Sequence, residues 1–237
     1  MGLFVILMGV QGAGKGEQAK YIREHYGIPH VSTGDLFRAM RQREDALARR
    51  VQQIMAEGRL VDDDTTNEVV EDRLAQPDAI GGVIFDGYPR TLAQAQWLEA
   101  HLASRSEQIG TVILLELDLY TAFKRAFGRV SSSKTGKSYN IYYNEAGIRW
   151  QFVDDPSNTF PPRLEAYLED GEPLVRRPDD ANAHAIIKRI DTYLATTRPL
   201  LDYYAKKGLL QRIDADQTIE AVSRAIHACL ETARARG

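Results

Sequence analysis

The sequence contains one cysteine, Cys229, which excludes an internal disulfide framework. Ile226 and Leu230 lie beside it on the predicted final helix, so we expect the Cys229 thiol to be a buried apolar filler. Long hydrophobic runs are also missing. The apolar segment at residues 3–8 is too short to cross a bilayer, and no basic segment precedes it. Neither secretion nor membrane insertion is indicated, and a cytoplasmic, reducing location is expected.

The chain also carries no strong excess of one charge. Its net charge is −3 at neutral pH, so there is no general electrostatic attraction to nucleic acid or to an anionic membrane. Of the 237 residues, 43% are hydrophobic, which is enough for one sizeable core with smaller inserted lobes. Any basic site must therefore be confined to a local cluster. We also expect a monomer whose partners are small molecules.

A glycine-rich loop is the most informative motif. Residues 9–16 read Gly-Val-Gln-Gly-Ala-Gly-Lys-Gly, between the apolar run at 3–8 and a helical pattern. Glycine lets the main chain approach a ligand closely, and the first N–H groups of a helix favour an anion. With Lys15 at the helix start, this arrangement predicts a cradle for a nucleoside polyphosphate. Gly16 departs from the pattern, since Ser or Thr normally holds Mg²⁺ there. The alternative is a glycine-rich turn with an incidental lysine.

Short apolar segments rich in β-branched residues alternate with helical patterns, at residues 3–8, 28–32, 82–86, 111–117 and 209–214. Such segments are typical of a parallel sheet that helices cover on both faces. The first helical pattern ends at Gly27, a common C-terminal stop. Further helical faces are predicted from Ile186 to Tyr204 and from Ile219 to Cys229.

Two stretches interrupt this alternation. Residues 33–61 are charged and helical in pattern. Residues 130–175 combine polar turns and prolines with many aromatic side chains, which indicates a small lobe with its own apolar cluster instead of a disordered linker. The aromatic residues of this second stretch are Tyr139, Tyr142, Tyr143, Trp150, Phe152, Phe160 and Tyr167.

Charged residues are predicted at the carboxyl end of one strand, where open α/β sheets bind their ligands. Transfer of a phosphoryl group between two nucleotides brings about five or six negative charges into one cleft, so several cations must converge there. Asp86 ends the strand at 82–86, where P-loop enzymes place the carboxylate that holds Mg²⁺ or its waters, and Arg90 follows it. The alternative is an ordinary strand-to-helix turn with a solvated arginine.

Four ordered motifs together resemble the adenylate kinases, a family of nucleoside monophosphate kinases. Beside the glycine loop they are Val-Ser-Thr-Gly-Asp-Leu-Phe-Arg at 31–38, Gly-Arg-Leu-Val at 58–61 and Phe-Asp-Gly-Tyr-Pro-Arg-Thr-Leu-Ala-Gln at 85–94. The resemblance covers nearly the whole chain. It implies an α/β P-loop fold of three layers with a five-stranded parallel sheet. It also implies a core (1–31, 62–129 and 181–237), a helical AMP-binding lobe (32–61) and an inserted lid (130–180).

The resemblance further implies an AMP pocket. Thr33 and Gln94 would face the adenine, and an amide side chain offers the donor and the acceptor that a purine edge requires. Arg38 and Arg90 would hold the α-phosphate, for which two guanidinium groups are well suited. The implied AMP-binding residues are Thr33, Arg38, Leu60, Val61, Gly87, Arg90 and Gln94.

A second set of residues resembles the ATP site and the catalytic cations of the family. Arg125 would lie against the donor adenine, and Arg129 would reach the donor phosphates from the same side of one helix. The implied ATP-binding residues are Gly12, Ala13, Gly14, Lys15, Gly16, Glu17, Arg125, Arg129 and Gln217. The implied catalytic residues are Lys15, Arg90, Arg129, Arg177 and Arg189, and Asp86 would hold Mg²⁺ through water.

The sequence also departs from the family pattern. Glu17 stands where the family has Thr, and like charges about 4 Å apart repel by about 4 kcal/mol at an effective dielectric constant of about 20. Glu17 must therefore turn away from the phosphates, ligate Mg²⁺ or weaken the enzyme. The segment from Asp180 to Arg189 is longer than the family spacing. Residues 130–175 contain neither Cys nor His, so the thiolate zinc site of many bacterial relatives is impossible there and no zinc is expected.

The predicted reaction is MgATP + AMP ⇌ 2 ADP. Positioning and charge neutralisation suffice for it, without a covalent intermediate. Two alternatives remain. One is a GTP-dependent AMP kinase, since backbone contacts near residues 215–217 would read the donor base. The other is a catalytically weak nucleotide-binding regulatory module, which Glu17 and the spacing from Arg177 to Arg189 would favour.

Overall fold

The computed structural model describes the chain except for residues 1, 58–60, 155–162, 178–179, 181 and 236–237. The chain divides into two compact units, and each contains an apolar cluster. The first unit comprises Met1–Gly9, Gly14–Glu116 and Leu194–Gly237. The second comprises Val10–Ala13 and Leu117–Tyr193.

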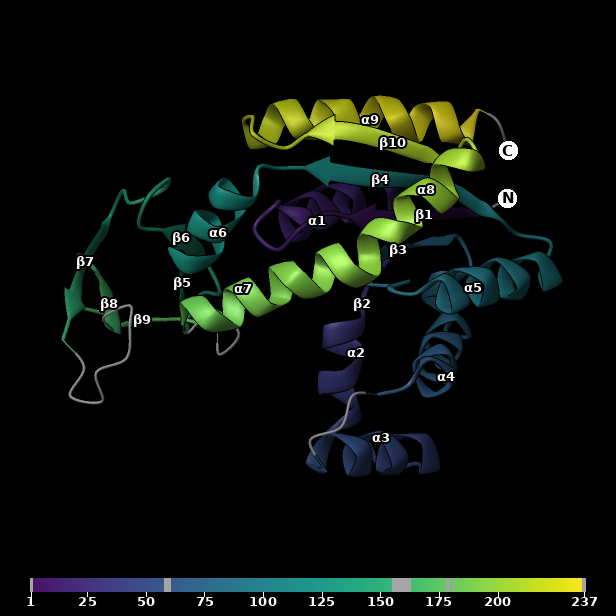
Figure 1. Ribbon diagram of the computed structural model, residues 1–237, viewed down its shortest axis with the longest axis horizontal. Helices are drawn as coiled ribbons and strands as arrows, with labels where there is room; N and C mark the ends of the chain where they lie inside the picture. The colour runs from purple at the N-terminus through teal and green to yellow at the C-terminus, as the bar shows by residue number, and fades with distance from the viewer. Residues whose placement is uncertain (1, 58–60, 155–162, 178–179, 181, 236–237) are drawn as a thin grey trace. The chain divides into compact units, whose positions relative to one another are not determined.

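The first unit is built around a five-stranded sheet with the order β10-β4-β1-β3-β2, and all of its strand pairs are parallel (Figure 1). The strands are β1 (Leu3–Met8), β2 (His30–Ser32), β3 (Gly82–Asp86), β4 (Ile109–Glu116) and β10 (Leu210–Asp214). The predicted α/β class and the five predicted strands are confirmed, with small shifts at the strand ends. β1 lies in the middle and is buried along nearly its whole length, as its uninterrupted apolar sequence requires.

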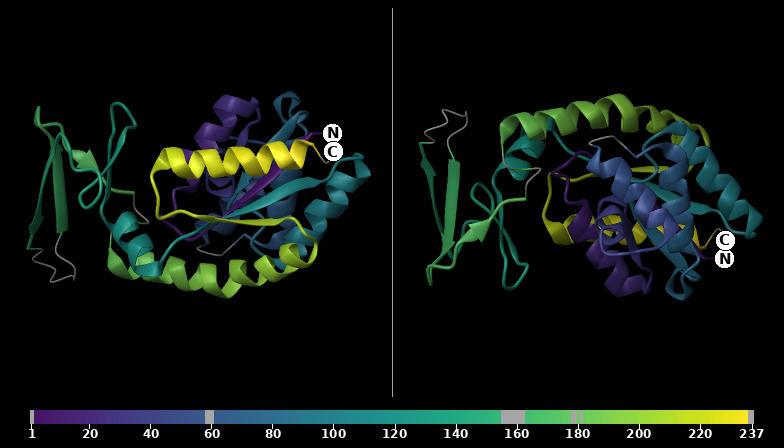
Figure 2. Two further views of the ribbon diagram at one scale, coloured as in Figure 1. Left: turned by 90° about the horizontal axis from the view of Figure 1, so that it is seen from above. Right: turned by 90° about the horizontal axis from the view of Figure 1, so that it is seen from below.

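Helices cover both faces of this sheet. Figure 2 shows α8 and α9 on opposite sides of β10. α1 packs beside α9, and α5 packs beside α8. The helices of the first unit are α1 (Lys15–Tyr26), α2 (Thr33–Met40), α3 (Ala46–Ala56), α4 (Asp63–Leu74), a 3-10 turn (Pro77–Ala79), α5 (Leu92–Ser104), α8 (Arg198–Lys206) and α9 (Ile219–Arg234). α1 stops at Gly27 with a φ of 68°, as predicted.

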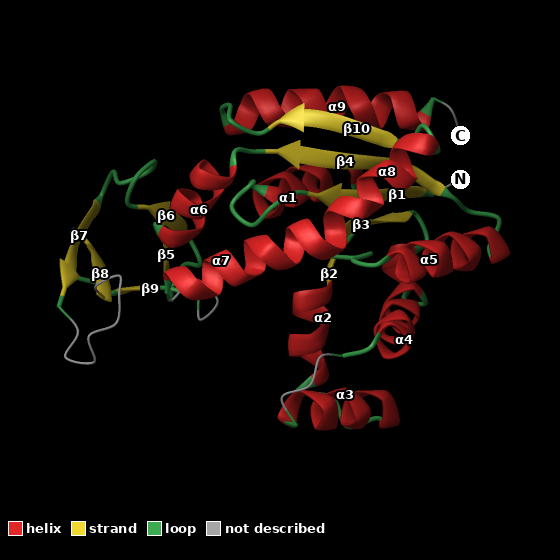
Figure 3. Ribbon diagram, viewed as in Figure 1, coloured by secondary structure: helices red, strands yellow, loops and turns green. Residues whose placement is uncertain are grey.

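Two helices, α2 and α3, lie in the stretch that was predicted to be helical (Figure 3). α2 and α3 contact each other, and both contact α4. Met40, Ala48, Val51 and Val69 form a separate apolar cluster between these helices. This cluster gives the helices of the stretch an apolar interior of their own.

In the residues that the structure describes, the second unit combines the helices α6 and α7 with small antiparallel sheets (Figure 3). Its helices are α6 (Leu119–Phe127) and α7 (Ala183–Thr192). Its strands are β5 (Arg129–Ser132), β6 (Ser138–Asn140), β7 (Ile148–Val153), β8 (Arg163–Leu168) and β9 (Leu174–Val175). β5 lies between β6 and β9, and β7 pairs with β8. The buried side chains of the lobe are Val130, Tyr139, Ile141, Leu164, Ala166 and Leu174. The predicted apolar cluster of residues 130–175 is therefore confirmed.

The composition of that cluster differs from the prediction. It is mostly aliphatic, whereas Tyr142, Tyr143, Trp150 and Phe152 are exposed. The strand pairing explains part of this. Trp150 of β7 lies opposite the small Ala166 of β8, and β7 pairs only with β8 among the described strands. The Trp150 ring contacts the exposed rings of Tyr142 and Phe152. Phe160 lies outside the described residues.

The predicted helical face from Ile186 to Tyr204 is interrupted. A π-helical segment, Tyr193–Thr197, separates α7 from α8, and none of its side chains is buried. Ile186 and Tyr204 are buried on the two flanking helices, as predicted. A π segment adds a residue to the turn and shifts the face that follows. The prediction of one continuous helix was therefore wrong.

The single cysteine also departs from its prediction. Cys229 lies on α9 but is half-buried, not buried, and partial desolvation raises the pKa of its thiol. Within the described parts of the chain, no helix is both long enough and apolar enough to cross a membrane.

Candidate active site

The glycine loop joins β1 to α1. α1 begins at Lys15, directly after Gly14, whose φ of 87° is left-handed. The Lys15 ammonium group donates a hydrogen bond to the Gly9 carbonyl at 2.8 Å. The cation is therefore held at the carboxyl end of β1 and next to the first N–H groups of a helix, which is where an anion binds most favourably.

The middle of this loop, Val10–Ala13, belongs to the second unit. A contact within that unit requires glycine at residue 12. Gly12 has a φ of 93°, and a Cβ atom there would lie 2.5 Å from the Ala122 carbonyl oxygen on α6. Any side chain at this position would clash with the backbone. The Ala13 N–H donates to the Val10 carbonyl at 3.1 Å, which closes the turn. The loop conformation is thus one that only glycine permits at residue 12.

Asp86 occupies the carboxyl end of β3, in register with Leu7 of β1 and Ser32 of β2. The His30 Nε2 atom lies 3.3 Å from its Oδ2 atom, and since a carboxylate only accepts, Nε2 is the donor. Burial raises the pKa of Asp86, but the His30 hydrogen bond and the charges of Lys15 and Arg90 outweigh it, so the pKa is lowered. The carboxylate stays ionised at neutral pH, as a Mg²⁺ ligand must be. His30 was not predicted, although its strand neighbours Asp86.

A second group of predicted residues meets at the start of α2 and the turn after β3. The Thr33 hydroxyl donates to the Gly87 carbonyl at 3.0 Å, and the Arg90 Nε atom donates to the same oxygen at 2.8 Å. Arg90 Nη2 lies 3.4 Å from Thr33 Oγ1. Gly87 has a φ of 72°, so the turn favours glycine. An exposed guanidinium group is thereby fixed beside a buried threonine.

Gln94 lies on the first turn of α5 and is 5% exposed. Its Nε2 atom donates to Asp63 Oδ1 at 2.6 Å, and its Oε1 atom accepts from the Arg90 N–H at 2.7 Å. The Thr91 hydroxyl donates to Asp63 Oδ2 at 2.7 Å and accepts from the Gln94 N–H at 3.2 Å. Asp63 was missed by the sequence analysis.

Three further predicted residues of the first unit, Arg38, Val61 and Gln217, make other contacts. Arg38 is exposed on α2 and forms an ion pair with Asp35. Val61 packs against the apolar cluster between α2 and α4, and Leu60 lies outside the described residues. Gln217 is exposed and hydrogen-bonds to Asp214 after β10.

In the second unit, the buried carboxylate of Asp180 contacts two of the predicted cations, Arg129 and Arg189. Asp180 is 0% exposed. The Arg129 Nε atom donates to Asp180 Oδ2 at 3.0 Å, and Arg189 Nη1 lies 3.8 Å from Oδ1. Gln11 of the glycine loop also donates to Asp180. A buried carboxylate is costly without such partners, so Asp180 orders Arg129 and Arg189.

Two further predicted arginines also belong to this unit. The backbone carbonyl of Arg177 accepts from the Asp180 N–H at 2.9 Å, and its side chain is exposed. The Arg125 guanidinium carbon lies 5.5 Å from the centre of the Tyr143 ring, within the range of a cation–π contact.

Comparison with known proteins decides the family. Residues 7–209 match the family model described as adenylate kinase. The chain belongs to the adenylate kinase family. It is 39% identical over 222 residues to the adenylate kinase of Moorella thermoacetica, covering 94% of this chain and 95% of that protein. It is 38% identical over 232 residues to the adenylate kinase of Shouchella clausii, covering 98% and 99%, and 41% identical over 221 residues to that of an Anaeromyxobacter species, covering 93% and 95%.

Membership of the adenylate kinase family confirms the prediction made from the four motifs. It also confirms the enzyme class, a nucleoside monophosphate kinase of the P-loop type. The roles of the individual residues stay predictions. Among the residues that the structure describes, no group of three or more His, Cys, Asp and Glu side chains is placed to hold a metal ion.

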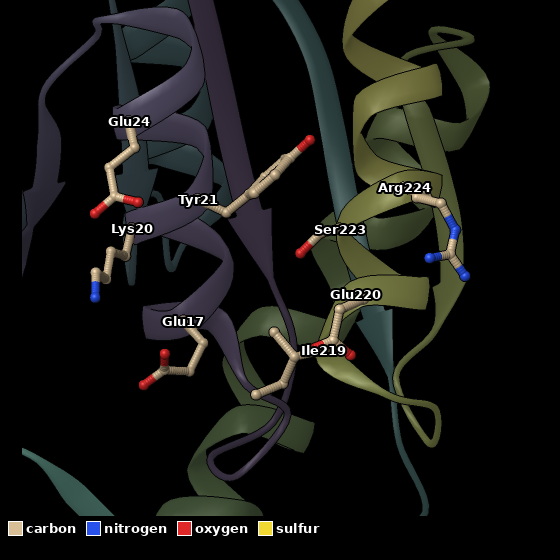
Figure 4. Close-up of a pocket in the computed structure, with 8 residues that line it drawn as sticks. All are labelled: Glu17, Lys20, Tyr21, Glu24, Ile219, Glu220, Ser223 and Arg224. Carbon is tan, nitrogen blue, oxygen red and sulfur yellow. The ribbon is translucent and has the colours of Figure 1, made fainter.

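Glu17 stands where the resemblance to adenylate kinases implies a Thr. It is exposed on the first turn of α1 and lines an open groove of about 380 Å³ between α1 and α9 (Figure 4). Figure 4 shows Glu17, Lys20 and Glu24 on the same side of α1. Of the three predicted possibilities, this position favours a carboxylate that turns away from the phosphates.

We therefore expect Glu17→Thr to keep or raise the rate of phosphoryl transfer. The substitution removes a negative charge near the phosphate loop and introduces a hydroxyl group that can contact phosphate or metal. The measurement is kcat for ADP formation at saturating ATP and AMP. A loss of about a thousandfold would show that Glu17 is an essential metal ligand instead.

Proposed function

We propose that the residues described above carry the reaction of this adenylate kinase family member, the reversible transfer of a phosphoryl group from MgATP to AMP. The arrangement of Thr33, Gly87 and Arg90 beside the buried Gln94 carries the proposal. Arg90 offers a cation that can bind a phosphate, and Gln94 offers an amide that can bind a base. Both residues belong to the first unit. A nucleoside monophosphate requires both.

The donor site is proposed at the glycine loop. The backbone N–H groups of residues 12–16 would bind the phosphates of ATP. The Lys15 ammonium group would neutralise the negative charge on the phosphoryl group that is transferred. Arg125 would lie against the donor adenine, and Gln217 would contact it from the loop after β10. Tyr143 supports the first assignment, because it holds the Arg125 guanidinium plane beside an aromatic ring.

Catalysis then depends on position and charge. Lys15, Arg90, Arg129, Arg177 and Arg189 would neutralise the charge that spreads over the phosphoryl oxygens in the transition state. Asp180 supports this by holding two of these arginines before substrate arrives. No side chain needs to form a covalent intermediate.

The residues also fit Mg²⁺. Asp86 offers an ionised oxygen ligand at the strand end beside Lys15, and Mg²⁺ prefers oxygen ligands and retains several of its waters. Bound there with ATP, Mg²⁺ would neutralise phosphate charge. We propose that Asp86 holds it through water, and no zinc site is proposed.

We propose that each predicted lobe binds one nucleotide. Residues 32–61 would form the AMP-binding lobe and residues 130–180 a lid that closes over ATP and excludes water, which would otherwise hydrolyse it. The chain would act as a cytoplasmic monomer. A GTP-dependent kinase and a weak regulatory module are not favoured, since the relatives are named adenylate kinases.

A coupled assay with different acceptors and donors tests this proposal. We expect rapid turnover with AMP and much slower turnover with CMP, UMP and GMP, because the Gln94 amide would read the adenine edge. ATP is expected to be a better donor than GTP. Equal turnover with all four acceptors would contradict the role of Gln94.

A further inference from the structure

The side chain of Gln94 is held in one orientation by two independent contacts. Its Nε2 atom donates to the Asp63 carboxylate at 2.6 Å, and its Oε1 atom accepts from the Arg90 backbone N–H at 2.7 Å. A carboxylate can only accept a hydrogen bond and a backbone N–H can only donate one. Both partners therefore require the same placement of the amide nitrogen and oxygen.

Asp63 is itself held in place. It is the first residue of α4, half-buried, and its second carboxylate oxygen accepts from the Thr91 hydroxyl at 2.7 Å. Thr91 caps α5 by accepting from the Gln94 N–H at 3.2 Å. Asp63 cannot rotate away without leaving two donors unpaired, one of them on the buried Gln94.

These contacts leave one N–H and one carbonyl lone pair of the Gln94 amide for a ligand. The Watson–Crick edge of adenine presents an acceptor at N1 and a donor at its 6-amino group. A 6-oxopurine, such as hypoxanthine or guanine, presents a donor at N1 and an acceptor at O6. The two edges are thus reversed. An amide that turns freely can pair with either edge, whereas a fixed amide pairs with one.

We propose that Asp63 is a positioning residue that makes the acceptor site prefer a 6-aminopurine monophosphate over a 6-oxopurine monophosphate by fixing the orientation of the Gln94 amide. The inference rests on the proposed contact between Gln94 and the acceptor base. To turn its amide, Gln94 would have to point its oxygen at the Asp63 carboxylate and its nitrogen at the Arg90 N–H. Both hydrogen bonds would be replaced by repulsive contacts.

Substitution of Asp63 removes half of this restraint. In Asp63→Asn, the new amide can itself turn and donate to Gln94, so only the Arg90 N–H still opposes the turned state. In Asp63→Ala, no acceptor is left at this position. Both residues are compatible with the first turn of a helix, and the control is Asp64→Asn. It removes the same charge from the same turn of α4, but Asp64 is exposed.

The experiment measures kcat/KM for AMP and for IMP, with MgATP as donor, on one preparation of each variant. The quotient of the two values is independent of the fraction of active enzyme, so a loss of folded protein cancels. We expect the AMP-to-IMP quotient to fall about tenfold or more in Asp63→Asn and in Asp63→Ala. This fold-change corresponds to the free energy of one hydrogen bond to a charged group. It should stay within about twofold in Asp64→Asn, and the KM for ATP should not change.

Gln94→Ala separates this inference from the proposed function. If Gln94→Ala lowers the quotient but both Asp63 variants keep it within about twofold of the wild type, the role of Asp63 is wrong and the contact of Gln94 with the base stands. If Gln94→Ala leaves the quotient unchanged, the proposed contact fails and the inference fails with it. A purely structural role of Asp63 would lower both kcat/KM values equally, which would also overturn the inference.

Discussion

Lys15→Met is expected to lower kcat for ADP formation by about a thousandfold or more. The ammonium group of Lys15 lies at the end of β1, 2.8 Å from the Gly9 carbonyl, and directly at the start of α1. Phosphoryl transfer depends on fixed positive charge around the transferring group, and methionine offers similar length without charge. The measurement is a coupled assay at saturating ATP and AMP.

The same helix provides the control. Lys20 is exposed five residues further along α1, so Lys20→Met removes an equal charge without changing the loop. Its kcat should stay within about twofold of the wild type. Both variants should melt close to the wild type, because Lys15 is only half-buried. Normal turnover by folded Lys15→Met would remove the glycine loop from the mechanism.

Arg90→Met is expected to lower kcat/KM for AMP by about a hundredfold to a thousandfold. The guanidinium group is held by the Gly87 carbonyl and lies near Thr33, so it is positioned before any ligand binds. Removal of a fixed cation from a phosphate site costs both affinity and transition-state stabilisation. The measurement is the dependence of the initial rate on AMP concentration at saturating ATP.

Arg73→Met is the matched control for this variant. Arg73 is on α4 in the same unit and pairs with Asp78. Its replacement should leave kcat/KM for AMP unchanged within about twofold. If Arg90→Met raised the KM for ATP and left that for AMP unchanged, the assignment of Arg90 to the acceptor phosphate would be wrong.

The sequence predicts the fold and the strand-end residues well for a physical reason. Apolar runs identify buried parallel strands, and the carboxyl ends of such strands meet at one edge. Asp86 is the last residue of its strand, so its place beside Leu7 of β1 follows from the strand alone. Lys15 follows similarly from its position after a glycine loop. These residues need only local sequence to be placed.

The residues that hold the site together could not be predicted in this way. Asp63 contacts Gln94 across 31 residues, and Asp180 contacts Arg129 across 51. In the sequence, both acids look like ordinary helix-start or loop residues. Their roles come from tertiary packing, which periodicity does not reveal. The exposed rings of the lobe and the π-helical segment at Tyr193–Thr197 were missed for the same reason.

A crystal structure with AMP and a non-hydrolysable ATP analogue tests the central claim most directly. Direct transfer requires both nucleotides in one molecule, with the γ-phosphorus of the analogue about 3–3.5 Å from an oxygen of the AMP phosphate and in line with the bond to be broken. The account predicts that separation, with Lys15 and Arg90 on the phosphates and Gln94 on the acceptor adenine. Two phosphate tails bound too far apart for direct transfer would contradict it.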